Sequence, residues 1–397
     1  MVPVHGDIDF LLNGGTTILK MFSEAFLPYI KYQIKVLRLF KCVPFNVNSN
    51  NEIIVTETKN FQKLLRQFIQ LLQWSYFIFM CRKVYTLQKE GCHLKAISSA
   101  MIVASRLTVL LFSYNWNPNV KAATLFNALV KFDKDYVINP SFQDLIRKRA
   151  RSLKMALFLL TTVPETVYFS SFRRFVQDPC SPPFLGSVIL NCARCGGTDK
   201  SRIPWYMWVG LVLLDGYNTL ACLHNGFFYF FYILLVTIFS FLQYIRDLGK
   251  RTMPEGFKIY RRLQILEVLI SDYSRTRLLP CTLGVAPIVE VLGLFTIIKF
   301  HDRIPFPGIL IFPIGCMTAL TGLASLETMS GSVVIRSEEA ISTWKKEAGS
   351  NPLRRRKLRS LQSMKIRFGN NYLDRLTALI TQDFCLNQTV SLLIMFK

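Results

Sequence analysis

Residues Trp205–Leu242 read WYMWVGLVLLDGYNTLACLHNGFFYFFYILLVTIFSFL and form the longest apolar stretch of the chain. The stretch has 38 residues, and Asp215 is its only acidic residue, with no Lys or Arg. A transmembrane helix needs about 20 apolar residues. The stretch is therefore long enough for one crossing with a helical extension, or for two crossings that turn near Asp215, Asn218, His224 and Asn225. This choice sets the topology of the rest of the chain.

Six further stretches have the length of a membrane span, roughly 17–25 residues. They are Leu64–Met80, Ala96–Tyr114, Met155–Phe172, Leu278–Ile298, Ile304–Leu326 and Leu376–Phe396. The composition agrees with a membrane protein, because 51% of the residues are hydrophobic and 32 are Phe. The sequence therefore predicts an all-α membrane protein.

The distribution of Lys and Arg decides between seven and eight spans. If Trp205–Leu242 crosses once, 35 of the 48 Lys and Arg residues fall in the N-terminal segment and alternate loops, and 11 fall in the opposite loops. If it crosses twice, 18 fall on the N-terminal side and 28 on the other. Because cytoplasmic loops carry the excess of cations, the pattern predicts seven transmembrane helices with a cytoplasmic N-terminus.

The spans divide one domain, residues 1–397, into four parts. Residues 1–63 form a cytoplasmic N-terminal segment with an amphipathic helix at Phe22–Phe40 that lies at the membrane interface. Residues 64–326 hold the first six spans, 327–375 a basic cytoplasmic loop, and 376–397 the seventh span. Helical periodicity in the basic loops predicts cytoplasmic extensions of the spans, at Arg246–Ser271, Ser337–Trp344 and Leu353–Met364.

The net charge of +23 does not indicate a nucleic-acid-binding protein, because the cations lie in loops beside the spans rather than in one basic domain. Such loops face the anionic lipids of the inner leaflet, where each cation contributes about 1 kcal/mol. We therefore expect membrane lipid as a partner and no nucleic acid.

Enzyme chemistry finds little support in the sequence. The chain has four His residues, none with a His or Cys partner at metal-ligand spacing,. No nucleophile elbow, P-loop or dinucleotide-binding glycine motif is present. We expect no catalytic residue, no metal and no cofactor.

Three cysteines share the predicted extracellular loop Arg173–Ile203, where disulfides can form. They are Cys180, Cys192 and Cys195. Either Cys180 pairs with Cys192 or Cys195, or all three are free. If one pair forms, the third cysteine is unpaired or reaches Cys81 or Cys92.

Polar residues inside membrane spans are costly and are therefore candidates for function. One interpretation is a buried ion pair of Arg106 with Glu165 or Asp215 that holds helices together. The other is a ligand pocket with apolar walls and a few converging polar groups, as small organic ligands require. The predicted ligand-binding residues are Arg106, Glu165, Tyr168, Asp215, Tyr217 and Asn218.

The chain resembles the arthropod gustatory and odorant receptors. It shares their seven spans, cytoplasmic N-terminus and amphipathic first helix. Their motif in the last helix is Thr-Tyr, an apolar run and Gln-Phe, and Thr389–Phe396 keeps its Thr and Phe but lacks the Tyr and Gln. Gly369–Tyr372, before the last helix, is also similar. The resemblance is greater to the gustatory branch.

This resemblance implies a ligand-gated cation channel subunit of the plasma membrane that detects small organic compounds in a taste-like role. It implies a homotetramer or heterotetramer with related subunits, in which the last helix of each lines one central pore. At helical spacing, one stripe of that helix would be pore lining: Thr381, Phe384, Gln388, Ser391 and Met395, with Leu392 or Phe384 as an apolar gate. Ordinary helix packing is the alternative explanation of this stripe.

Two other classes remain open. A G-protein-coupled receptor would have the opposite topology, and the chain lacks a D-R-Y-like triplet after the third span and N-P-x-x-Y in the seventh. A secondary transporter would need substrate flux, and no internal repeat is evident.

The topology can be tested with introduced glycosylation acceptors. An acceptor in the N-terminal tail or at Arg354–Lys357 is expected to stay unmodified, because both sites are predicted to be cytoplasmic. An acceptor at Thr198–Arg202 is expected to gain a glycan. Gel mobility before and after glycosidase treatment reads the result, and a glycan at Arg354–Lys357 would favour eight spans.

Overall fold

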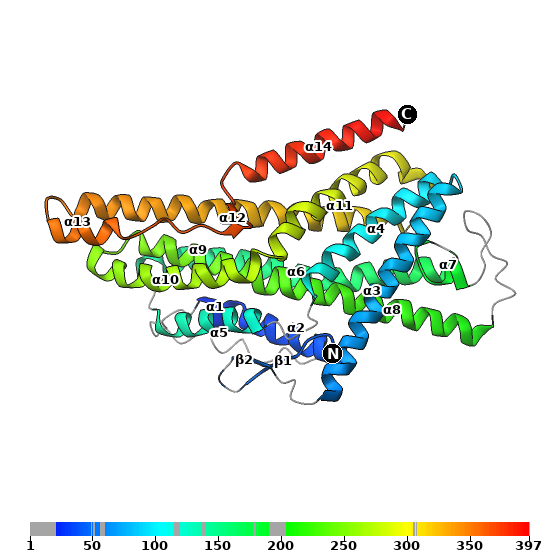
Figure 1. Cartoon of the computed structure of the whole chain (residues 1–397), viewed down its shortest axis with the longest axis horizontal. Coiled ribbons are helices and arrows are strands. Elements are labelled where there is room, and N and C mark those ends of the chain that lie inside the picture. Colours follow the sequence, from blue (N-terminus) through cyan, green and yellow to red (C-terminus); the bar gives the residue numbers. More distant parts are fainter. Residues whose placement is uncertain are drawn as a thin grey trace.

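The computed structural model is an elongated bundle of helices (Figure 1). The structure describes residues 21–48, 50, 52–55, 60–114, 120–136, 140–177, 180, 182–189, 204–304, 306 and 308–396. The longer helices are α3 (Asn60–Lys89), α4 (His93–Phe112), α6 (Pro140–Gln177), α8 (Trp205–Phe227), α9 (Val236–Leu248), α10 (Met253–Ser274), α11 (Leu278–Phe300), α12 (Ile311–Glu347) and α14 (Thr377–Met395). A π-helical segment, η3 (Phe228–Leu235), joins α8 to α9.

Shorter elements complete the chain. The helices are α1 (Met21–Ala25), α2 (Leu27–Leu39), α5 (Val120–Asp135), α7 (Gly186–Ile189) and α13 (Pro352–Arg359), with 3-10 turns η4 (His301–Arg303) and η5 (Gly308–Leu310). Two small antiparallel hairpins pair β1 (Phe45–Val47) with β2 (Ile53–Val55) and β3 (Arg367–Phe368) with β4 (Asn371–Tyr372).

Within the described residues, five helices are long and apolar enough to cross a membrane. The spans are Lys95–Phe112, Arg151–Arg173, Trp205–Leu248, Leu278–Arg303 and Ile311–Glu347. The predicted all-α fold is confirmed, and these helices indicate a multi-pass membrane protein. The predicted first and last spans coincide with α3 and α14, which are less apolar, so the count of seven stays a prediction.

The stretch Trp205–Leu248 is one uninterrupted helical run through α8, η3 and α9, with no chain reversal near Asp215 or Asn225. Its 44 residues extend about 66 Å at about 1.5 Å per residue, twice the roughly 30 Å of bilayer hydrocarbon. The structure thus has one extended helix here, as the sequence predicted. All eight residues of η3 are buried, so this helix is the centre of the bundle.

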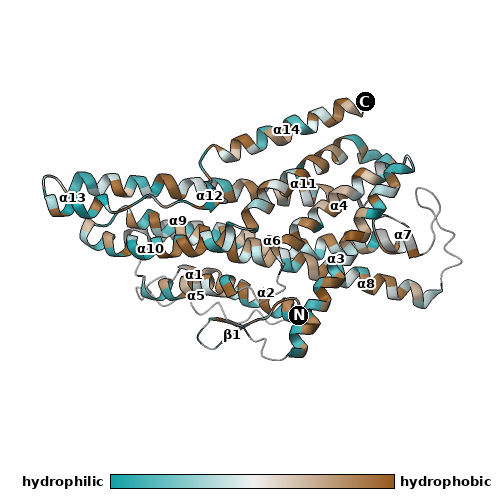
Figure 2. Ribbon diagram, in the orientation of Figure 1, coloured by the Kyte–Doolittle hydropathy of each residue, from teal (hydrophilic) through white to brown (hydrophobic). Residues whose placement is uncertain are grey.

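At one end of the molecule, α9, α10, α13 and the C-terminal half of α12 form an extended bundle (Figure 1). Trp344 on α12 fills its interior and donates from Nε1 to the Arg251 carbonyl at 3.0 Å. Gly256 makes room for the indole, since a Cβ there would lie 2.3 Å from it. Figure 2 shows hydrophilic residues gathered on α13 and the adjoining end of α12.

Residues 327–375 are therefore not a simple loop. The α12 helix continues to Glu347, and α13 and the β3–β4 hairpin follow. The predicted extension at Ser337–Trp344 is confirmed as part of α12. Arg246–Ser271 does not continue the central helix, because α9 ends at Leu248 and α10 begins at Met253, and Leu353–Met364 is helical only to Arg359. Burial raises the pKa of the Glu267 carboxyl on α10, which accepts from the Lys365 backbone N–H at 3.1 Å. This contact ties the segment before β3 to α10.

The N-terminal segment packs along the central helix. The predicted amphipathic helix is present as α1 and α2, and α2 buries Ile30, Gln33, Ile34 and Leu37. Asp133 on α5 is buried and accepts from the backbone N–H groups of α1 at 2.9 and 3.2 Å. It therefore satisfies the free amides at the start of that helix.

Candidate functional site

A cavity of about 180 Å³ lies among α3, α4, α6, α8, η3, α11 and α12. For scale, an apolar cavity of about 150 Å³ holds benzene. Its walls are mainly apolar and aromatic, with side chains that include Met80, Met101, Val109, Phe112, Val163, Phe227, Phe230, Phe231, Val289 and Leu323. Such a lining suits a small organic molecule.

The π-helical segment brings two consecutive aromatic residues, Phe230 and Phe231, to the cavity. Phe230 stacks on Phe112 with ring centroids 5.3 Å apart, and Phe231 packs on Phe227 at 5.0 Å. Gly322 on α12 faces these rings, and a Cβ there would lie 3.1 Å from Phe230. π-helical turns are frequent at functional sites because they change which side chains share a face.

Four hydroxyl groups of the cavity wall can only accept hydrogen bonds from a ligand, because their protons are already donated within the protein. Four hydroxyls donate to carbonyls one turn earlier in their own helices, at 2.7–3.0 Å: Ser105, Thr108, Thr282 and Thr318. Arg106 is the cationic group of the lining. Its guanidinium donates from Nη2 to the Asn218 carbonyl at 3.2 Å, and its buried Nε has no acceptor among the described residues.

Arg106 and Asp215 are joined through Tyr76 rather than by an ion pair. The Arg106 guanidinium carbon lies 4.2 Å from the centre of the Tyr76 ring. The Tyr76 hydroxyl donates to Asp215 Oδ1 at 2.7 Å. No direct ion pair of Arg106 with Glu165 or Asp215 is present in the described part of the chain. The ion-pair interpretation is therefore wrong in this form. We call the chain of contacts Arg106–Tyr76–Asp215 the relay.

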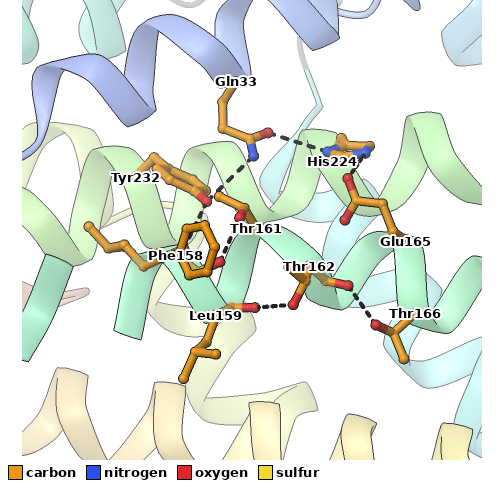
Figure 3. Close-up of polar contacts among 10 residues, drawn as sticks. Gln33, Phe158, Leu159, Thr161, Thr162, Glu165, Thr166, His224 and Tyr232 are labelled. Carbon is orange, nitrogen blue, oxygen red and sulfur yellow. Dashed lines mark hydrogen bonds and ion pairs between the residues drawn. The ribbon is translucent and has the colours of Figure 1, made fainter. Parts of the chain in front are cut away.

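Three of the predicted ligand residues lie away from the cavity. Glu165 on α6 faces His224, with Oε1 3.5 Å from Nε2, and Gln33 on α2 lies 3.3 Å from the other ring nitrogen (Figure 3). Gln33 also donates to the Tyr232 hydroxyl at 3.4 Å. These contacts fasten α2 to α6 and the central helix.

Tyr217 and Tyr168 are the other two. The Tyr217 hydroxyl donates to the Phe40 carbonyl at 2.8 Å, next to α2. Tyr168 packs on Gly216, where a Cβ would lie 3.0 Å from its ring. The cavity is thus lined by Arg106, with Asn218 and Asp215 beside it, while Glu165, Tyr168 and Tyr217 make contacts elsewhere.

Helix α14 lies on the outside of the bundle, against α11 and α12 (Figure 1). Its inner face buries Cys385 and Thr389. Of the predicted pore residues, Thr381 faces α12 and donates to Glu327 at 2.8 Å, and Leu392 is half-buried. The remaining four are exposed in the single chain: Phe384, Gln388, Ser391 and Met395.

The cysteine prediction is partly resolved. Cys180 is disulfide-bonded, as is Cys92, and Cys81 is free. The alternative in which all three loop cysteines are free is therefore wrong for Cys180. Cys192 and Cys195 lie outside the described residues, so a pairing that involves them stays a prediction.

The fold is similar to that of the insect olfactory receptor OR5 from Machilis hrabei. The chain matches this structure with a TM-score of 0.64 and 13% identity, over 92% of this chain and 97% of that one. It matches the same receptor in complex with eugenol with a TM-score of 0.62 and 12% identity, over 93% and 98% of the two chains. No protein-family model and no curated protein sequence matches the chain. The resemblance predicted from the sequence is confirmed for the fold.

Replacing Tyr76 with Phe tests the relay. The substitution removes the hydroxyl that donates to Asp215, and an unsatisfied buried acceptor costs about 1–3 kcal/mol. Y76F is expected to lower the thermal unfolding temperature of the purified protein in detergent. Y85F is the control, because Tyr85 lies on the same helix and is 69% exposed. Equal effects of the two variants would contradict a structural role for the relay.

Proposed function

We propose that the chain is a subunit of a ligand-gated cation channel that detects small organic compounds. The observation that carries this proposal is the apolar cavity, two of whose walls, α11 and α12, also contact α14. The fold shared with an olfactory receptor supports it, as does the eugenol complex of that receptor. We further propose a taste-like role at the plasma membrane, with the N-terminus in the cytoplasm.

We propose that the ligand is a neutral molecule with an apolar body and one acceptor oxygen. Arg106 offers a buried N–H donor to the cavity, whereas four hydroxyls of the wall already donate to backbone carbonyls. Tyr76 couples Arg106 to the carboxylate of Asp215, so the guanidinium charge already has a counter-charge nearby. A carboxylate ligand would add a second buried anion, which is costly in an apolar site.

The exposed face of α14 is the proposed pore lining. A single chain leaves Phe384, Gln388, Ser391 and Met395 uncovered, and four chains around one axis would bring this face together. Gln388 and Ser391 would replace part of the hydration shell of an ion, and Phe384 or Leu392 would close the pore by dewetting. Asp383 is also exposed on this helix and would attract cations. We expect little selectivity among monovalent cations.

Three related compounds test the ligand proposal on cells that express the chain. Acetophenone carries the acceptor oxygen, ethylbenzene lacks it, and benzoate is an anion of the same size. Acetophenone is expected to evoke the largest current. R106M is expected to raise its half-maximal concentration at least about tenfold, since a hydrogen bond to a charged group is worth about 1.5–3 kcal/mol. The response to ethylbenzene should not change.

R82M is the control for charge removal, because Arg82 is exposed on α3. Surface labelling measures how much of each variant reaches the membrane. A larger response to benzoate than to acetophenone would contradict a neutral ligand. An R106M variant with unchanged sensitivity to acetophenone would remove Arg106 from the site.

Cysteine substitution along residues 381–395 tests the pore. Thiol reagents are expected to alter the current at Phe384, Gln388, Ser391 and Met395, with the period of a helix. The native Cys385 faces the bundle and is buried, so wild-type current should resist the reagent. Insensitivity at all positions, in a protein that conducts, would move the pore elsewhere.

A further inference from the structure

Two buried carboxylates lie where α14 meets the rest of the bundle. Glu290 on α11 is 2% exposed, and Glu327 on α12 is fully buried. Glu327 Oε1 accepts from the Thr381 hydroxyl at 2.8 Å, and Glu290 Oε2 accepts from the Gln382 amide at 3.3 Å. Thr381 and Gln382 are consecutive residues of α14, so two different helices form hydrogen bonds with the same turn of α14.

The same two helices form walls of the cavity. Val289, directly before Glu290, and Leu323, one turn before Glu327, both line it. None of the cavity-lining residues in the described part of the chain belongs to α14. A molecule in the cavity therefore acts on α14 through other elements, and α11 and α12 both line the cavity and contact α14.

The chemistry of this site is unusual for membrane depth. No Lys, Arg or His lies within 4.0 Å of either carboxylate in the described residues. The ionisable groups nearby are the two carboxyls themselves and the thiols of Cys316 and Cys385. Unpaired ionisable groups inside a membrane are costly and tend to be functional.

We propose that Glu290 and Glu327 are the coupling residues that transmit displacement of α11 and α12 to α14. This inference rests on the proposed channel function. Consecutive Cα atoms are fixed at about 3.8 Å, so Thr381 and Gln382 cannot separate when α11 and α12 move relative to one another. A shift between the two helices beyond what these side chains can follow by rotation would therefore break a contact or carry α14 along.

Thr381 has a ready alternative partner. Its hydroxyl lies 2.9 Å from the Thr377 carbonyl of its own helix as well as 2.8 Å from Glu327. It donates to one acceptor at a time, so releasing Glu327 does not leave the hydroxyl without a partner. The Glu327–Thr381 contact thus has two positions for the hydroxyl. The cost of exchange falls on Glu327, whose Oε1 loses this donor and whose Oε2 has no donor among the described residues,.

Two substitutions at Thr381 separate coupling from packing. Valine keeps the shape of threonine and removes the hydroxyl, whereas serine keeps the hydroxyl and removes a methyl group. Coupling predicts that T381V shifts the half-maximal acetophenone concentration at least about fivefold, within the usual range of coupling between sites. T381S should stay close to wild type. A packing role predicts the reverse order.

A double-mutant cycle with Glu327 completes the experiment. E327L should shift the response as T381V does, and the double variant should shift it no further, because both remove one contact. E327Q keeps an acceptor oxygen and should retain most of the wild-type response. Glu339 is exposed on α12, so E339Q controls for removal of a carboxylate from that helix.

Surface labelling and acetophenone binding to purified protein accompany each current measurement. Additive effects of E327L and T381V, or shifts no larger than that of the control, would overturn the coupling while the channel function stands. A wild-type protein that gives no current with any compound would instead contradict the proposed function, and the coupling with it.

Discussion

The apolar surface of the central helix constrains the whole molecule. About 66 Å of helix at about 1.5 Å per residue cannot fit in roughly 30 Å of hydrocarbon, so about half of Trp205–Leu248 lies beyond it. That half carries Ile238, Phe241 and Ile245, which are buried in the structure. Exposed to water, such side chains would each cost about 1.5–3 kcal/mol. The extended bundle and the N-terminal segment enclose them. The need to bury these side chains therefore explains why α1, α2, α5, α10 and α12 pack around the central helix.

The sequence predicted much of this fold because its signals are strong and local. The lengths of apolar stretches located the long helices, and the charge distribution favoured one crossing at Trp205–Leu242, where the structure has one continuous helix. The basic loops were harder. Residues after Leu326 carry many cations, and the sequence predicted a loop there with a short helix at Ser337–Trp344. In the structure α12 continues unbroken to Glu347 and buries Ala340 and Trp344. Glu327 was therefore overlooked as a buried residue.

The candidate site was predicted less completely, because a helix buried on all sides does not reveal which face meets which neighbour. Asp215 and Asn218 lie beside the cavity, whereas Tyr217, only one residue from Asn218, faces α2 because each residue turns the helix by about 100°. Tyr76 was missed for a different reason. Its hydroxyl matters only because α8 places Asp215 2.7 Å away, and no local pattern in the sequence encodes that distance. The stripe predicted on α14 stays a prediction, and the contact of Thr381 with Glu327 on α12 could not be derived from helical spacing.

As a ligand site, the cavity would combine weak discrimination by shape with stronger discrimination by one polar group. An added methylene in an apolar pocket changes binding by about 1–3 kcal/mol, whereas a buried donor left unpaired rejects a ligand far more strongly. Aromatic walls from Phe112, Phe227 and Phe230 would therefore accept ligands of many shapes and similar volume. In the proposed site Arg106 would add a requirement for an acceptor at one place, and its contact with Tyr76, which donates to Asp215, puts a counter-charge nearby when no acceptor is bound. The relay would thus let a membrane-buried cation serve as a donor without requiring an anionic ligand.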